Sequence, residues 1–169
     1  MNLHIKTGDV LDEPCDVLIC SANPQLNMSG GVNGAIVLRG GQDVQEELWA
    51  FLRGSGQPHA QPGSVVRTGP GPLRAKHILH AVAVDAFYGS SIELVRHTIE
   101  TALKQAQELG AATVAMPSLA TGYGPLSMEQ FAQALSAAVQ PEWPGIEQLS
   151  VVVRSEENAE IIMRVLALQ

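Results

Sequence analysis

The sequence is poor in basic residues. Lys and Arg number 10 of 169 residues against 17 Asp and Glu, which gives a formal net charge of −7. Electrostatic binding to a nucleic-acid backbone needs clustered Lys and Arg, so the charge argues against a nucleic-acid partner of that kind. A compact anionic ligand held in a local pocket is compatible with this composition.

Long apolar runs are also missing. No stretch approaches the roughly 18 apolar residues that a membrane-spanning helix requires. Residues 1–6 lack the apolar core of a signal peptide. We therefore expect a cytoplasmic protein without a membrane partner.

The sequence has only two cysteines, and it lacks two common nucleotide-binding motifs. Cys15 and Cys20 are the only cysteines, and five residues apart on one expected extended segment they suit neither a disulfide nor a zinc site. No G-x-G-x-x-G follows the first expected strand, and the P-loop pattern is absent. We expect reduced thiols, no metal and no cofactor.

What is present suits one domain over residues 1–169, because 46% of the residues are hydrophobic and only 16% are charged. Period-2 and short apolar runs predict strands at 3–6, 17–20, 64–68, 77–83, 113–116 and 149–153. Helical spacing predicts helices at 32–38, 43–54 and 90–109, after Ser127 and after Ser155. This order predicts an α/β fold, a three-layer α/β/α sandwich with a central mixed sheet of about six strands.

Helix ends carry capping signals. Ser90 with Glu93 and Ser127 with Gln130 are spaced as capping boxes, and Ser155 suits the cap of the last helix. The apolar face of that last helix is expected to bury Ala159, Ile162, Met163 and Leu166.

The most informative stretch is the first loop, residues 21–30, with the residues on either side of it. An apolar strand ends at Cys20, and Gly30, Gly31 and Gly34 precede or open an apolar helix. In this order the glycines let the backbone approach a ligand, and the free N–H groups of the helix start point toward an anion. No Lys or Arg lies between Lys6 and Arg39, so an anion here would be bound by main-chain N–H groups. A plain glycine-rich turn is the alternative.

The second loop, residues 118–125, has the same place between a strand and a helix. Ligands of open α/β sheets bind outside the carboxyl ends of the strands, so the two loops are expected to line one crevice. A simple tight turn would use Gly122 and Gly124 in the same way.

These residues resemble the macrodomain family. Cys20-Ser21-Ala22-Asn23 and Ser29 to Ile36 are similar to its N-A-A-N and G-G-G-V-D-G-A-I segments, and Ala120 to Gly124 are similar to its S/G-T-G-x-G loop. Gly8-Asp9-Val10 resembles its G-D-I segment. Two positions depart from the pattern, because Cys20 stands where relatives have Asn and Asn33 stands where they have Asp.

The resemblance implies a single macrodomain that binds ADP-ribose or an ADP-ribosylated substrate. It implies that Asp9 accepts a hydrogen bond from the adenine amino group, and that Val153 or Arg154 replaces the aromatic residue that stacks on adenine in relatives. Asn23, helped by Asn33, would be the catalytic pair at the distal ribose. The remaining implied ligand-binding residues are Val10, Ser29, Gly30, Gly31, Val32, Ala120, Thr121, Gly122, Tyr123 and Gly124.

The resemblance leaves the activity open. Hydrolytic macrodomains cleave ADP-ribose from proteins, O-acetyl-ADP-ribose or ADP-ribose 1″-phosphate, and we expect a metal-independent hydrolase of this kind. An amide such as Asn33 cannot accept a proton at neutral pH, so the ligand's own phosphate would have to activate water. A non-catalytic reader of ADP-ribose and a structural α/β domain that binds neither are the alternatives.

Histidine offers a further candidate pair. His77 and His80 lie on one expected strand, where a histidine bonded within the sheet is the alternative to a general base. His59 is expected to be a solvated loop residue.

Overall fold

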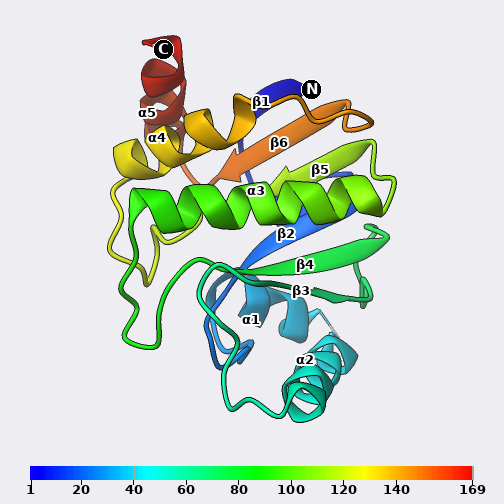
Figure 1. Cartoon of the computed structure of the whole chain (residues 1–169). Helices are drawn as coiled ribbons and strands as arrows, with labels where there is room; N and C mark the ends of the chain where they lie inside the picture. Colours follow the sequence, from blue (N-terminus) through cyan, green and yellow to red (C-terminus); the bar gives the residue numbers. More distant parts are fainter. Residues whose placement is uncertain (40, 169) are drawn as a thin grey trace.

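A mixed sheet of six strands forms the centre of the protein in a computed structural model that describes residues 1–39 and 41–168. The strands run in the order β1-β6-β5-β2-β4-β3, and every neighbouring pair is parallel except β3 with β4. Their bounds are β1 Asn2–Thr7, β2 Val17–Ala22, β3 Val65–Thr68, β4 His77–Val82, β5 Thr113–Met116 and β6 Gln148–Val153. The predicted mixed sheet of about six strands is confirmed (Figure 1).

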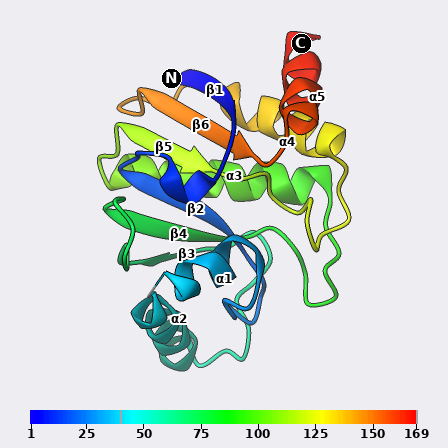
Figure 2. The ribbon, with the colours of Figure 1, turned by 180° about the vertical axis from the view of Figure 1, so that it is seen from behind.

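Helices cover both faces of this sheet. Their bounds are η1 Val10–Asp12, α1 Gly31–Leu38, α2 Gln42–Ser55, α3 Ile92–Glu108, α4 Met128–Val139 and α5 Glu156–Ala167. The longest helix, α3, lies in front of the strands in Figure 1 and behind them in Figure 2, which shows the layers from the other side. No helix of the described residues is both long enough and apolar enough to cross a bilayer.

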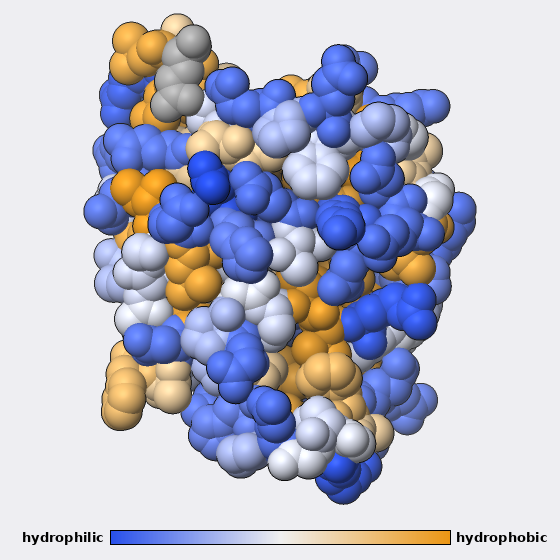
Figure 3. Space-filling model, viewed as in Figure 1, coloured by the Kyte–Doolittle hydropathy of each residue, from blue (hydrophilic) through white to orange (hydrophobic). Residues whose placement is uncertain are grey.

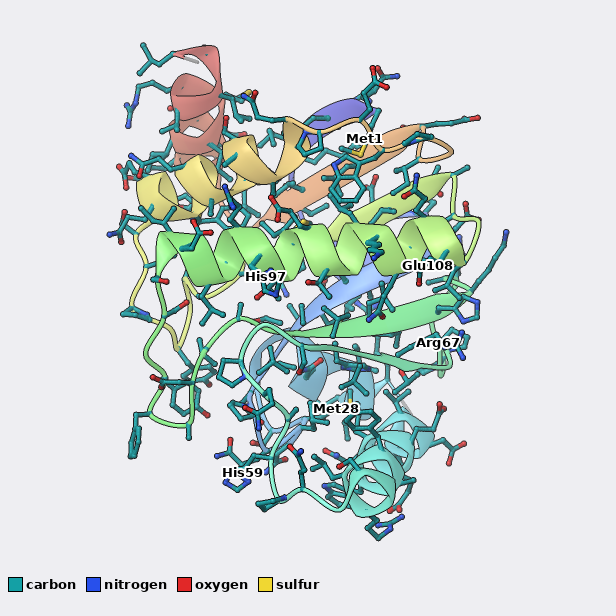
Figure 4. All side chains as sticks on the ribbon, in the orientation of Figure 1. Met1, Met28, His59, Arg67, His97 and Glu108 are labelled. Carbon is teal, nitrogen blue, oxygen red and sulfur yellow. The ribbon has the colours of Figure 1, made fainter. Side chains whose placement is uncertain are left out.

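Successive side chains along a strand pack into two different hydrophobic cores, one on each face of the sheet. On β2, Val17 and Ile19 pack with α3, α4 and α5, whereas Leu18 and Cys20 pack with α1 and α2. This is why β2 reads as a continuous apolar run, as expected for a parallel strand that is buried on both faces. Met28 lies in the core that includes α1 and α2, in the lower layer of Figure 4. The three-layer prediction therefore holds.

Burial accounts for the two cysteines. Both are free thiols, Cys20 is fully buried, and desolvation raises the pKa of Cys15 to about 11 and that of Cys20 further still. A thiol that stays protonated at neutral pH is a poor nucleophile and a poor metal ligand. Both cysteines serve as packing residues.

Two details of the helices differ from expectation. The cap of α3 is Ser91, whose side chain accepts from the Leu94 N–H, because the Ser90 hydroxyl donates instead to the Ala83 carbonyl at 2.6 Å. On α5, Met163 is 48% exposed and so was wrongly placed in the core. Only a narrow stripe of this helix, centred on Ala159 and Ile162, faces the sheet, with Leu166 partly buried beside it. The capping box of Ser127 and Gln130 and the cap at Ser155 are present as predicted.

His80 is a buried part of the sheet. Its Nε2 lies 2.9 Å from the Thr68 hydroxyl, which itself lies 3.0 Å from the Gly69 carbonyl. Since the hydroxyl proton goes to that carbonyl, Nε2 must be the protonated nitrogen, and Nδ1 is buried without a partner among the described residues. Burial lowers the pKa of His80 to about 4. His59 is exposed in the loop before β3, as Figure 4 shows.

We predict that His80 makes the protein less stable in mild acid. The folded-state pKa near 4 lies below the unfolded value near 6.5, so the unfolded chain takes up the proton first as the pH falls. Stability should therefore be lost between pH 6.5 and 4, by up to roughly 3 kcal/mol from this group. Denaturant unfolding of wild type and of His80→Gln, which keeps a donor for Thr68, measures the loss. Equal pH slopes in the two proteins would contradict the assignment.

Candidate functional site

A cleft of about 510 Å³ opens at the carboxyl ends of the central strands. Its floor is formed by residues at or just after the ends of β2, β4, β5 and β6, and its walls are the first and second loops. Both loops follow parallel strands and precede helices, so the strand order alone brings them to the same edge of the sheet. The size is ordinary for a small-molecule site.

Most of the residues singled out in the sequence line this cleft. Those that do are Val10, Asn23, Ser29, Gly30, Gly31, Val32, Asn33, Ala120, Thr121, Gly122, Tyr123, Gly124, Val153 and Arg154. Asp9 is the exception and lies just outside the lining. His77 and His80 lie on β4 and do not reach the cleft either.

Asp9 lies outside the cleft lining and holds two residues that belong to it, Val10 and Arg154. One carboxylate oxygen accepts from the Leu11 N–H at 3.0 Å and so caps η1, which holds Val10 in place. The other oxygen lies 3.4 Å from a guanidinium nitrogen of Arg39 and 3.4 Å from one of Arg154. Asp9 thus reaches the cleft through Arg154.

The first loop delivers the start of α1 into the cleft. Gly30 and Gly31 have φ of 98° and 56°, values that L side chains rarely adopt, and the Gly34 N–H makes a bond of 2.8 Å to the Gly30 carbonyl. The N–H groups of residues 31–33 precede this first helical bond and have no partner within the helix. With the positive end of the helix dipole behind them, they form a set of donors whose geometry suits an anion.

Gln45 of α2 braces the same loop from the core side. Its Oε1 accepts from the Met28 N–H at 2.7 Å, and its Nε2 donates to the Leu26 carbonyl at 2.8 Å. This pair of bonds satisfies the backbone of the loop beneath the glycines, so the glycine segment is held although it carries no side chains of its own. Sequence reasoning missed Gln45, because a Gln on a helix gives no sign of a partner 17 residues away.

The second loop offers a matching set of N–H groups. Ala120 has φ of 57°, and its carbonyl accepts from the Leu126 N–H at 3.0 Å, which closes the loop. The hydroxyls of Ser118 and Thr121 are 2.7 Å apart and tie its base. Within the described part of the chain, the N–H groups of residues 121–124 donate to no protein acceptor. They are free for a ligand.

The cleft has little side-chain charge. Arg154 is the one charged side chain among the described residues that line it. The described residues also contain no cluster of three or more His, Cys, Asp or Glu side chains that could hold a metal ion. An anion in the middle of the cleft would therefore be bound by main-chain N–H groups from two sides, as in other main-chain anion sites.

Two asparagines lie at the base of the first loop. Both ends of the Asn23 amide bond the backbone of Asn27, with Oδ1 accepting at 3.0 Å and Nδ2 donating at 3.2 Å. Asn33 donates from Nδ2 to the Ser21 carbonyl at 2.7 Å, which leaves its buried Oδ1 without a partner in the described residues. Since the carbonyl of Ser21 fixes which way the amide faces, the unpaired polar atom of Asn33 is Oδ1, an acceptor that is buried and is not a base.

Several lining residues were not anticipated. The most informative is Tyr88, whose ring centroid lies 6.2 Å from that of Tyr123. Tyr88 follows β4, so it too lies at a strand-to-helix connection, and that position was a usable signal. The others are Val84, Pro117, Met128, Val152 and Asn158, whereas Ser21, Ala22, Asn27 and Ser118 also line the cleft but belong to the two loops expected there.

Comparison with known proteins bears on this site. A family model described as Macro domain matches residues 19–135. An uncharacterized protein of Pyrobaculum aerophilum is 32% identical over 164 residues, which cover 95% of this chain and 88% of that protein. A macro domain-containing protein of Caldanaerobacter subterraneus subsp. tengcongensis is 32% identical over 163 residues, with 94% and 92% covered.

Solved structures show the same fold. The Oceanobacillus iheyensis macrodomain with ADP has a TM-score of 0.88 at 24% identity, with 98% of this chain and 90% of that chain covered. The Trypanosoma brucei macrodomain in complex with ADP-ribose has a TM-score of 0.81 at 20% identity, with 96% and 68% covered.

We predict that Gly124→Ala disrupts the second loop and that Gly122→Ala does not. A Cβ at Gly124 would lie 2.5 Å from the Ala120 carbonyl oxygen, whereas one at Gly122 would meet nothing within 4 Å. Overpacking should cost Gly124→Ala about 1 to 3 kcal/mol of unfolding free energy, and Gly122→Ala should stay within about 1 kcal/mol of wild type. Thermal unfolding measures both. Equal stability of the two variants would contradict the loop geometry.

Proposed function

This chain belongs to the macro domain family, and from that premise we propose that its cleft binds ADP-ribose or a close derivative. The observation that carries the proposal is the pair of free N–H sets, from residues 31–33 and 121–124, on the two loop walls of one cleft. A diphosphate between them would receive main-chain hydrogen bonds from both sides. The ligands in the Oceanobacillus and Trypanosoma structures support the choice.

The strand order suggests how the ligand lies. We place the adenine at the β6 end, against Val10 and Val153, with Arg154 stacked on it or pairing with Asp9 beside it. The distal ribose then lies at the β2 end, within reach of Asn23 and Asn33. Residues 1–169 act as one macrodomain in this proposal.

We further propose hydrolysis of an ADP-ribosyl linkage, in ADP-ribosylated protein, O-acetyl-ADP-ribose or ADP-ribose 1″-phosphate. Asn33 Oδ1 is buried, so the lining has to shift before this atom accepts a hydrogen bond from a distal-ribose hydroxyl or from the attacking water, and Asn23 orients the ribose. The ligand's own phosphate takes the proton of that water, because Asn33 cannot. The loop N–H groups stabilise the charge on the phosphates, and no step needs a metal.

A non-catalytic reader of ADP-ribose is the second candidate, and one observation favours it. No Asp, Glu or His is among the described residues that line the cleft, so no side chain there can take the proton of an attacking water. Binding through the loop N–H groups needs no such side chain.

We expect ADP-ribose at about 100 times its Kd to raise the unfolding free energy by about 2.7 kcal/mol. Calorimetric titration with ADP-ribose, AMP and ribose 5-phosphate then measures how much each half of the ligand contributes. If ADP-ribose produces neither heat nor a thermal shift, the protein does not bind this ligand and is a structural α/β domain.

Catalysis is tested with Asn23→Ala on mono-ADP-ribosylated protein. Turnover should fall about tenfold or more while the fold persists, as expected for the loss of one positioning group. Asn2→Ala is the matched control, because Asn2 begins β1 at the opposite end of the sheet. If wild type binds ADP-ribose but turns over none of the three substrates, the protein is a non-catalytic reader of ADP-ribose and not a hydrolase.

We predict that Asn33→Asp does not create a better enzyme. The introduced carboxylate would face the Ser21 carbonyl, to which Asn33 now donates at 2.7 Å, and should cost about 1 to 3 kcal/mol at pH 7. Its folded-state pKa should lie above the unfolded value near 3.9, so its stability deficit against wild type shrinks as the pH falls toward 4. Asn33→Ala supplies the control without this pH dependence. Wild-type stability with faster turnover at pH 7 would contradict the role given to Asn33.

A further inference from the structure

Aromatic residues gather at one rim of the cleft. The sequence has only three Phe, two Trp and two Tyr. Three of these seven are Phe87, its chain neighbour Tyr88, and Tyr123; Tyr88 and Tyr123 line the cleft with ring centroids 6.2 Å apart. Their exposed fractions are 93%, 43% and 76%. Figure 3 shows apolar colour on the surface where Figure 1 draws the connection from β4 to α3. Exposed aromatic residues that cluster beside a cleft mark a contact surface.

The connection that carries Phe87 is tightly built. The Asp85 carboxylate accepts from the Phe87 N–H at 2.8 Å and from the Gly89 N–H at 2.7 Å, and the Asp85 N–H donates to the Gly89 carbonyl at 2.8 Å. Tyr88 has φ of 61°, a costly conformation that the surrounding bonds maintain. The backbone of such a pre-organised loop loses little entropy when a partner packs on it.

The position of this rim follows from the sheet order. The cleft spans the ends of β6, β5, β2 and β4, with Arg154 after β6 and Tyr88 after β4. In the proposed ligand orientation, adenine lies toward Arg154 and the distal ribose toward β2. A group attached to the distal ribose would therefore leave the cleft toward Tyr88 and Tyr123, and Phe87 directly precedes Tyr88 in the chain.

The lack of positive charge on these loops limits which kind of group can be attached to the distal ribose. The sequence has no Lys or Arg between Lys76 and Arg96, nor between Lys104 and Arg154, so both loops of this rim lack cations. Phosphates of a nucleic-acid acceptor would find no partner here and would meet the carboxylate of Asp85 instead. An acetyl or phosphate group is small and offers little apolar surface to pack on the exposed Phe87 side chain.

We propose that Phe87, Tyr88 and Tyr123 form an acceptor-contact surface for a polypeptide that carries ADP-ribose on one of its side chains. The proposal rests on the ADP-ribose site above and selects protein-linked ADP-ribose among its three substrates. Apolar side chains next to the modified residue pack on Phe87, while the cleft binds the nucleotide. Phe87 is a specificity residue and takes no part in the chemistry.

The test compares free ADP-ribose with ADP-ribose joined through a hydrolysis-resistant linkage to a short peptide that has apolar neighbours. A third probe joins ADP-ribose to an oligonucleotide. Calorimetry should give a peptide conjugate that binds about fivefold or more tighter than free ADP-ribose. Phe87→Ala should remove this gain without changing the Kd of free ADP-ribose. Phe51→Ala, on α2 and 46% exposed, is the matched control and should keep the gain.

Each other result overturns the inference. Equal binding of conjugate and free ligand, or a gain that survives Phe87→Ala, removes the contact surface. Tighter binding of the oligonucleotide conjugate assigns the rim to nucleic acid. Weaker binding of free ADP-ribose by Phe87→Ala makes Phe87 part of the nucleotide site. Failure of wild type to bind free ADP-ribose is a different outcome, because it ends the proposed function itself.

Discussion

Unpaired main-chain N–H groups at the carboxyl edge of the sheet are the constraint on which this site depends. A helix that begins directly after a glycine turn leaves its first N–H groups without acceptors, and the second loop, closed by the bond from Leu126 to Ala120, leaves another set free. Parallel β2 and β5 bring the two sets to one cleft. The chain has ten Lys and Arg, of which Arg154 lines the described cleft. An anion in this cleft would therefore be bound mainly by backbone N–H groups, whose positions are set by the loop geometry.

That geometry has to be held from outside, because glycines contribute no packing. Gln45 supplies two bonds to the first loop from α2, and the buried strands supply a rigid floor. Asp85 does the same for the connection after β4. In each case one polar side chain satisfies two backbone groups, so the cleft keeps its shape through a few side chains that lie outside the ligand surface.

Hydrophobic periodicity and the Gly and Pro residues between the periodic segments were sufficient to predict the fold. The two glycine loops were sufficient to locate the cleft. The misplaced details have a shared physical origin in contacts between distant residues. Ser90 carries a good capping signal but is drawn to Ala83, so Ser91 caps α3. Met163 has the right spacing for the core, yet α5 turns only a narrow stripe toward the sheet. No local pattern encodes such choices, which depend on the packed structure.

The same limit applies to the site. Asp9 has the sequence position of a ligand residue, but its carboxylate is bonded to Leu11 and paired with Arg39 and Arg154 outside the lining. Main-chain binding of ADP-ribose is tested most directly by an amide NMR titration of the ¹⁵N-labelled protein with this ligand. The largest shifts should fall together on the N–H signals of residues 31–33 and 121–124. Saturable binding that leaves both sets unchanged, or that perturbs only one of them, would contradict this binding mode.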